Sequence, residues 1–174
     1  MQLALMPRME TQTNTGKTPA AKIHEALGDF SFVMLMTREN AGKARSRPMT
    51  IAQLDPDCTL WFITSASTAT ATNDAQIVGQ AGMKYLSMPG KIEVLRDRAR
   101  MEKMWSKAYD VWFPEGAADP DAVLLRFTPF EAELWDSAGI KGLHYLFESA
   151  KALITGEPPT PAKDQHIKTQ LQKD

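Results

Sequence analysis

The chain has 174 residues, of which 43% are apolar and 24% are charged, and these proportions are typical of one globular domain rather than a collagen, a disulfide scaffold or a disordered chain. Its 20 basic and 21 acidic residues give a formal charge of −1, which offers no basic surface for a nucleic-acid backbone. Cys58 is the single cysteine and no run approaches about 20 apolar residues, so we expect a cytoplasmic protein without a membrane-spanning helix.

The first part of the chain predicts an arm, a helix and three strands. Residues 1–18 are mostly polar and are expected to form a mobile arm. A short helix should follow, because Thr18 can cap it, Pro19 suits its first turn and Gly28 can close it. Aromatic and β-branched residues between turn sequences then predict antiparallel strands at residues 30–37, 44–54 and 59–64.

The middle of the chain predicts a weak helix and more strands. Ser67 or Thr68 can cap a short helix after the third strand, although threonine is a poor residue for a helix interior. Pro89 and Gly90 are typical turn residues and separate two of the next segments. The strands predicted here lie at residues 76–79, 84–88 and 91–95.

The last part of the chain predicts two helices with two strands between them. Asp97 is expected to open an amphipathic helix that runs toward Trp112. Residues 122–136 predict two further strands, and apolar residues at helical spacing over 143–154 predict a final helix. Residues 156–174 are expected to form a polar tail.

The predicted strands outnumber the helices and lack the regular strand–helix alternation of a parallel sheet. We therefore expect a mainly β fold with peripheral helices, in which residues 19–155 form an antiparallel barrel of six or seven strands. No metal is expected, since the three histidines have no ligand spacing with the single cysteine or the carboxylates.

The first candidate site is the segment Arg45-Ser46-Arg47-Pro48-Met49. The two-residue period of a strand places Arg45 and Arg47 on the face of Met49, with Ser46 opposite, and Pro48 favours an edge or a bulge. Guanidinium groups match phosphate oxygens, so this face suits an anionic ligand with a flat apolar body. The alternative is a pair of solvated arginines on an exposed strand.

The second candidate site is the apolar strand that ends at Thr64, together with the hydroxyl-rich turn after it. Hydroxyls and backbone amides at this turn can bind a phosphate where a short helix begins. The alternative is a buried strand followed by an ordinary capped turn. The residues concerned are Phe62, Ile63, Thr64, Ser67 and Thr68.

The segments RSRPM, LWFIT, KIEVLRDRARMEKMW and VWFPEGAADPDAVLLRFTPFEAELWD stand in the order seen in the general stress protein 26 family of pyridoxamine-phosphate-oxidase-like proteins. The chain resembles this family from about Ile23 to Thr155. The resemblance implies an FMN-binding split barrel that forms a homodimer, with FMN, or FAD in some relatives, in a groove between the subunits.

The resemblance also implies where the flavin lies. The RSRPM strand and the strand ending at Thr64 would follow the ring system and the ribityl chain, with Arg45 and Arg47 near the phosphate or the ring edge. Many relatives carry a lysine at the end of the next turn, where this chain has Thr70. Residues near the partner subunit would be Trp112 and Trp135.

The function implied by the resemblance is that of a flavin-dependent oxidoreductase with a small-molecule redox partner. No catalytic acid–base pair is recognisable in the sequence, and the substrate is not indicated. The alternative is a non-enzymatic stress protein that holds flavin weakly or not at all and acts through ligand or protein interactions.

Overall fold

The computed structural model describes residues 17–38, 42–137, 151 and 166–172. The predicted arm up to residue 16 and the predicted helix at 143–154, except for position 151, lie outside these ranges. The helical elements are α1 (Pro19–Leu27), α2 (Arg98–Met104) and the 3₁₀ turns η2 (Lys107–Val111) and η3 (Gly116–Ala118). The strands are β1 (Phe32–Arg38), β2 (Ala44–Thr50), β3 (Gln53–Leu54), β4 (Leu60–Ser65), β5 (Thr72–Ala81), β6 (Lys84–Leu95), β7 (Ala122–Pro129), β8 (Glu131–Asp136) and β9 (His166–Gln170).

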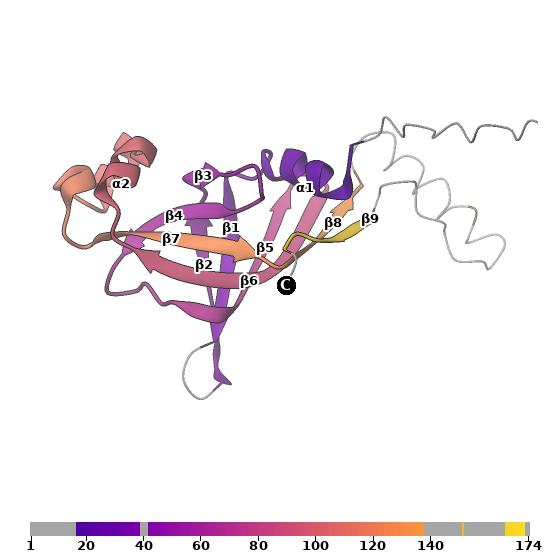
Figure 1. The fold of residues 1–174 in the computed structure, drawn as a ribbon, viewed down its shortest axis with the longest axis horizontal. Coiled ribbons are helices and arrows are strands. Elements are labelled where there is room, and N and C mark those ends of the chain that lie inside the picture. Colours follow the sequence, from indigo (N-terminus) through magenta and orange to yellow (C-terminus); the bar gives the residue numbers. More distant parts are fainter. Residues whose placement is uncertain (1–16, 39–41, 138–150, 152–165, 173–174) are drawn as a thin grey trace, which may run out of the picture.

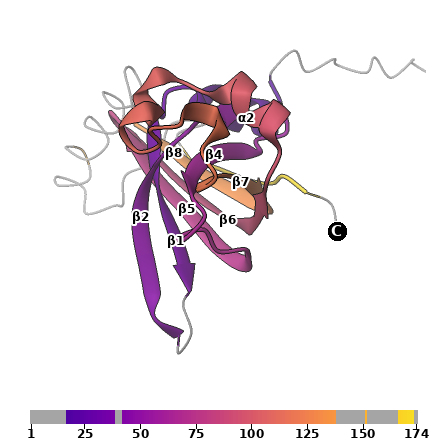
Figure 2. The same cartoon turned by 90° about the vertical axis from the view of Figure 1, so that its left-hand side faces the viewer.

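All strand pairs are antiparallel, and the sheet runs in the order β2-β1-β5-β6-β7-β4-β3, with β8 paired to β6 and β9. The sheet curls into a half-barrel, and α1 and α2 lie at its periphery (Figures 1 and 2). The mainly β, antiparallel split barrel predicted from the sequence is thus confirmed. The described sheet has nine strands rather than six or seven.

The barrel is open between β2 and β4. Both strands belong to the same sheet, yet they lie toward opposite ends of its pairing order and share no ladder. They nevertheless approach each other, and the side chain of Arg47 on β2 donates to the carbonyl oxygen of Thr68 just after β4, at 2.6 Å. This unpaired junction is called the seam below.

The core fills the curl of the sheet and is closed by α1. Phe62 on β4, Phe127 on β7 and Ile77 on β5 are fully buried there, and Ile23 presents the apolar face of α1 to the same cluster. As predicted, Thr18 caps α1 by accepting from the backbone N–H of Ala21 at 3.2 Å, and Pro19 occupies its first turn. This cluster holds the strands in register, and a second apolar cluster packs Met101 and Met104 of α2 with Trp61 and Ile63 of β4.

Strand β6 corrects the predicted turn at Pro89 and Gly90. The chain continues through both residues as one strand, because β6 changes partner there: residues 84–87 pair with β8 and residues 90–95 pair with β7. The Pro89 carbonyl accepts from the N–H of Phe130 at 2.9 Å, at the point where β7 gives way to β8. Pro89 and Gly90 thus mark a change of partner within a strand rather than a turn.

Two further segments differ from the sequence predictions. Residues 166–170, expected in a polar tail, form β9 on the edge of β8, with Ile167 buried beside Leu134. The helix that opens at Asp97 ends at Met104, because Trp105 has an extended backbone. The indole N–H of Trp105 then donates to Asp110 within η2 at 2.9 Å. Within the described residues, no helix is long and apolar enough to cross a membrane.

Gly90 provides a test of the close approach between β6 and β7. A Cβ added at Gly90 would lie 2.5 Å from both the Phe127 ring and the Thr128 carbonyl oxygen. We expect Gly90→Ala to lower the free energy of unfolding by about 1–3 kcal/mol, measured by urea denaturation. Gly28→Ala is the control, because Gly28 has φ −60 and its nearest neighbour would be the Glu25 carbonyl oxygen at 3.2 Å. A smaller loss at Gly90 than at Gly28 would contradict this account.

Cys58 is buried at the turn before β4, and it has a positive φ of 67. Burial, with a smaller contribution from the charge of Asp57, raises the pKa of its thiol from 9.0 to about 11. The unfolded thiol therefore ionises first, so this group stabilises the fold fully below about pH 9 and loses that contribution as the pH rises toward 11.

We expect the wild-type chain to lose stability relative to Cys58→Ala between pH 9 and about 11, by about 1.4 kcal/mol for each pH unit. Urea denaturation of both proteins at several pH values measures the difference, because all other groups titrate in both. Parallel stability curves would show that the thiol is not protected in the folded state.

Candidate functional site

The polar half of the candidate site is a pocket of about 410 Å³ at one end of the seam. The end of β1, the start of β2 and the turn after β4 contribute its walls. We call it the arginine pocket, and its lining residues are Thr37, Arg38, Arg45, Arg47, Ser67, Thr68 and Thr70. Three guanidinium groups and four hydroxyl groups therefore face one cavity, a donor set suited to a phosphate.

Strand β2 delivers its arginines as predicted. Arg45 and Arg47 line the arginine pocket, whereas the intervening Ser46 does not. The expected edge position of Pro48 is also confirmed, because β2 pairs with β1 alone. The contact from Arg47 to the Thr68 carbonyl fixes this strand relative to the turn across the seam.

The turn after β4 differs from the prediction of a short capped helix. The N–H groups of Thr68 and Ala69 both donate to the Ser65 carbonyl oxygen, at 3.1 and 3.0 Å. The N–H of Ser67 donates to the Ser65 hydroxyl at 3.2 Å. These amides are satisfied within the turn, so a phosphate in this pocket would be bound by side chains rather than by a helix N-terminus.

The apolar half of the candidate site is a groove of about 670 Å³ along the same seam. Strands β2 and β4 form part of its wall, and the segment around η2 supplies three of its four aromatic residues, the fourth being Phe32 of β1. We call it the apolar groove, and its lining residues are Phe32, Pro48, Met49, Thr50, Ile63, Thr64, Ser65, Tyr109, Trp112, Phe113 and Asp121. Its volume lies within the range typical of small-molecule sites.

The two cavities are neighbours along the chain. Residues of β2 pass from the arginine pocket at Arg47 to the apolar groove at Pro48, and the chain after β4 passes from the groove at Ser65 to the pocket at Ser67. A ligand that lies along the seam would therefore meet apolar and aromatic side chains at one end and guanidinium groups at the other.

Most of the predicted site residues line these two cavities, and three do not. Ser46 points away from the pocket, Phe62 is fully buried in the core, and Trp135 is on β8, where its ring stacks on His166 with the centroids 5.3 Å apart. The predicted residues that meet at the seam are Arg45, Arg47, Pro48, Met49, Ile63, Thr64, Ser67, Thr68, Thr70 and Trp112.

The sequence analysis missed Arg38, Tyr109 and Phe113 as lining residues. Arg38 ends the strand that pairs with β2, but the register pairs Thr37 with Arg45 and Arg38 with Ala44, so strand alternation alone does not place Arg38 on the face of Arg45. Tyr109 and Phe113 reach the groove only because the helix is interrupted after Met104. Burial raises the pKa of the Tyr109 phenol, so this side chain stays protonated and neutral at pH 7.

A charged cluster holds α2 against the sheet and so positions the aromatic wall of the groove. The Asp55 carboxylate accepts from the Trp61 indole N–H at 2.7 Å and from Arg100 at 3.1 Å. The Arg100 guanidinium also lies 3.6 Å from the centroid of the Trp61 ring. Arg100 is on α2, which leads directly into η2 and the groove.

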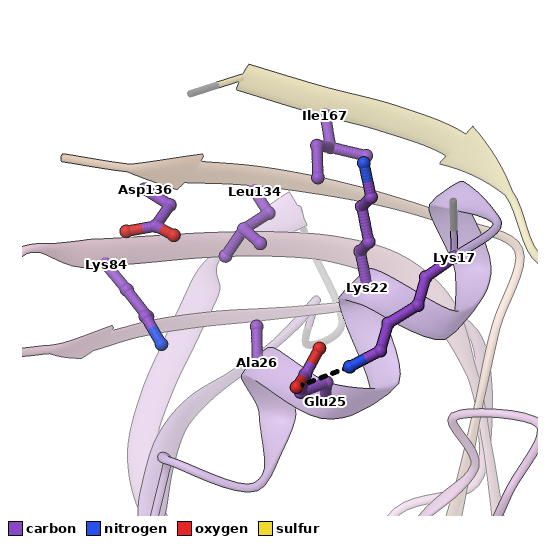
Figure 3. Close-up of a pocket in the computed structure, with 8 residues that line it drawn as sticks. All are labelled: Lys17, Lys22, Glu25, Ala26, Lys84, Leu134, Asp136 and Ile167. Atoms are coloured by element: carbon purple, nitrogen blue, oxygen red, sulfur yellow. Dashed lines mark hydrogen bonds and ion pairs between the residues drawn. The ribbon is translucent and has the colours of Figure 1, made fainter. Parts of the chain in front are cut away.

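A third cavity, of about 340 Å³, lies between α1 and the strands β6, β8 and β9 (Figure 3). Lys17 pairs with Glu25 at 2.7 Å, and Lys84 pairs with Asp29, a hydrogen bond that raises the pKa of Lys84. Carboxylates thus already balance these lysines, so we do not assign an anion site here. Across the described part of the chain, no group of three or more histidines, cysteines and carboxylates could hold a metal.

The family pattern described as "Pyridoxamine 5'-phosphate oxidase like" matches residues 18–160. The chain belongs to this family. The crystal structure of a protein assigned as general stress protein 26 from Jannaschia sp. CCS1 is 31% identical, with a TM-score of 0.63, and the match covers 84% of this chain and 94% of that one. A search of curated proteins found no match.

Two further solved structures support the same fold. The general stress FMN/FAD binding protein from Xanthomonas citri is 25% identical with a TM-score of 0.58, and the match covers 69% of this chain and 89% of that one. A protein from Clostridium acetobutylicum related to general stress protein 26 is 24% identical with a TM-score of 0.56, covers 66% of this chain and 85% of that one, and is similar in fold alone.

Proposed function

We propose that the chain binds a flavin, FMN or FAD, along the seam and acts as a flavin-dependent oxidoreductase on a small molecule. The observation that carries this proposal is that neighbouring residues of β2, Arg47 and Pro48, line the arginine pocket and the apolar groove in turn. A flavin combines a flat apolar ring system with a phosphate, and the two cavities offer the matching surfaces in that order. The FMN/FAD binding relative from Xanthomonas citri adds weight to this assignment.

The donor set fits the phosphate end of such a ligand. Arg45 and Arg47 would pair with phosphate oxygens, and the hydroxyls of Ser67 and Thr70 would donate to the oxygens that remain, whereas the Thr68 hydroxyl already donates to the Ser65 carbonyl oxygen at 3.2 Å. Because the guanidinium of Arg47 also holds the Thr68 carbonyl, the pocket keeps its shape before a ligand enters.

The apolar groove would hold the ring. Met49, Ile63 and Phe113 line it, so ring binding would bury apolar surface. A bound flavin supplies hydride or electron transfer through its own ring system. The protein's part is then to position and desolvate that ring, while neutral Tyr109 can donate a hydrogen bond to an acceptor on the ligand.

The proposal includes a homodimer in which each subunit helps to cover the ring of the other. Val111 and Trp112 are 78% and 76% exposed, and Phe32 at the same groove is 61% exposed. Exposed aromatic residues beside a ligand groove are the kind that protein interfaces cover. Trp135, which lies away from both cavities of its own subunit, would then contribute from the partner or serve only in its contact with His166. The cytoplasmic location stays a prediction.

A non-enzymatic flavin-holding protein is the second candidate. The ionisable side chains that line the apolar groove are Tyr109 and Asp121, which is a sparse set for general acid–base chemistry. Hydride transfer to or from a bound flavin needs no such pair. Reduction of the bound flavin by NADH or NADPH, followed by turnover with an added acceptor, would distinguish the oxidoreductase from a holder of flavin.

The role of Arg47 tests the flavin site. We expect Arg47→Ala to weaken FMN binding by about tenfold, because a charge-assisted contact to phosphate contributes about 1.5–3 kcal/mol before solvent screening reduces it. Riboflavin, which lacks the phosphate, should lose much less affinity. Titration with quenching of flavin fluorescence measures both, with Lys103→Ala on exposed α2 surface as the control. Unchanged FMN affinity in Arg47→Ala would contradict this placement.

The proposed assembly predicts a dimer in solution. We expect sedimentation velocity of the wild-type chain to give the mass of two subunits. Trp112→Ser should shift the equilibrium toward monomer and weaken flavin binding together, since the same residue lines the groove and is exposed in one chain. Lys107→Ser, an exposed change in the same segment, should alter neither property. A wild-type monomer that binds flavin fully would exclude the shared site.

A further inference from the structure

Arg38 is the third guanidinium of the arginine pocket, and it comes from β1 rather than from β2. The β1–β2 ladder pairs Thr37 with Arg45 and Arg38 with Ala44, so the end of β1 lies beside the start of β2. Figures 1 and 2 show this hairpin projecting away from the body of the barrel. Arg38 thus brings a guanidinium from β1 to a pocket whose other two arginines are on β2.

Strand β5 places a carboxylate across from Arg38. The β1–β5 ladder ends with Thr37 paired to Ala75, so the next residues on the two strands are Arg38 and Asp74. The Asp74 carboxylate lies 2.8 Å from Nε of Arg38. On the other side of β5 the register with β6 shifts between Thr72 and Ala75, and the Thr72 hydroxyl accepts from the N–H of Asp74 at 3.1 Å.

The pairing with Asp74 leaves Arg38 able to bind a second anion. A guanidinium has five N–H donors in a planar fork, and Asp74 is contacted through Nε. The two terminal nitrogens lie on the remaining edges of that fork, which matches a phosphate bidentately. Since both side chains of the pair are about 70% exposed, the ion pair itself contributes little to stability.

The charges of the pocket match a phosphate monoester. Arg38, Arg45 and Arg47 bring three positive charges to one cavity, and the Asp74 carboxylate pairs with Arg38. A terminal phosphate carries about −1.5 to −2 at pH 7. Arg38 is the one guanidinium of the three that β1 supplies, so it adds a donor to those that Arg45 and Arg47 bring from β2.

We propose that Arg38 is a phosphate-binding residue of this chain and that it makes the pocket selective for a phosphorylated ligand over the same ligand without phosphate. This inference rests on the proposed flavin site and adds to it a residue from a different strand. It concerns the ligand's phosphate group alone and is independent of any redox activity.

The test compares FMN with riboflavin in four proteins: wild type, Arg38→Ala, Arg38→Lys and Lys43→Ala. Lys43 is exposed on the same hairpin and does not line the pocket, so its variant removes one positive charge without removing a pocket donor. Dissociation constants come from quenching of flavin fluorescence, and circular dichroism confirms that each variant is folded.

We expect Arg38→Ala to weaken FMN binding about fivefold and riboflavin binding less than about twofold, with Lys43→Ala close to wild type for both. Arg38→Lys should fall between, because an ammonium keeps the charge and loses the planar fork. The affinity of Arg38→Ala for FMN should also depend less on salt than that of the wild type.

Four results would overturn the inference. Wild-type FMN affinity in Arg38→Ala, or an equal loss for FMN and riboflavin, would remove Arg38 from the phosphate site and leave the flavin proposal standing. An equal loss in Lys43→Ala and Arg38→Ala would assign the effect to general charge. A wild-type chain that binds neither ligand would refute the flavin site itself, and the inference with it.

Discussion

The candidate site depends on the lack of hydrogen-bond pairing between strands β2 and β4. Strands β2 and β4 approach each other at the ends of one curled sheet, yet they do not pair, so the barrel keeps a gap along its length. The Arg47 guanidinium crosses that gap to the Thr68 carbonyl, and cavities lie along the gap on either side of this contact. A closed ladder would have filled the space in which we place the ligand.

Each of the two strands is fully paired on one edge, and β3 takes part of the second edge of β4 by pairing with Leu60 and Trp61. Strand β2 pairs along its full length with β1, and β4 pairs along its full length with β7. The Asp55, Trp61 and Arg100 cluster then fixes α2 beside β4, and the aromatic residues after α2 cover the outer side of the gap. Groups remote from the ligand thus determine the width of its site.

Much of the fold was readable from the sequence, because strands with one buried face carry a regular apolar pattern. The ends of β6 and the location of β9 could not be predicted from the sequence. Pro89 and Gly90 are turn residues by local preference, and only the exchange of partner from β8 to β7 explains why the strand continues through them. Strand β9 has Ile167 as its one buried apolar residue, so no alternation marks it.

The candidate site was partly readable for a similar reason. Arg45 and Arg47 share a face because of their spacing in one strand, whereas Arg38 is a charged residue at a strand end, and its hairpin partner Ala44 does not mark it as a pocket residue. Phe62 and Ile63 are neighbouring apolar residues of one strand, but Phe62 faces the core. The sequence of a strand that is apolar on both faces does not reveal which face points to the core.

The partner exchange of β6 also bears on how the chain folds. The β5–β6 hairpin is local in sequence, whereas the β4–β7 and β8–β9 ladders join segments far apart in the chain. Local ladders form first and distant ones later, since closing a long loop costs entropy before contacts repay it. The seam requires β4 in its final place, so it belongs to the late part of folding, and a ligand that spans it would act mainly by slowing unfolding.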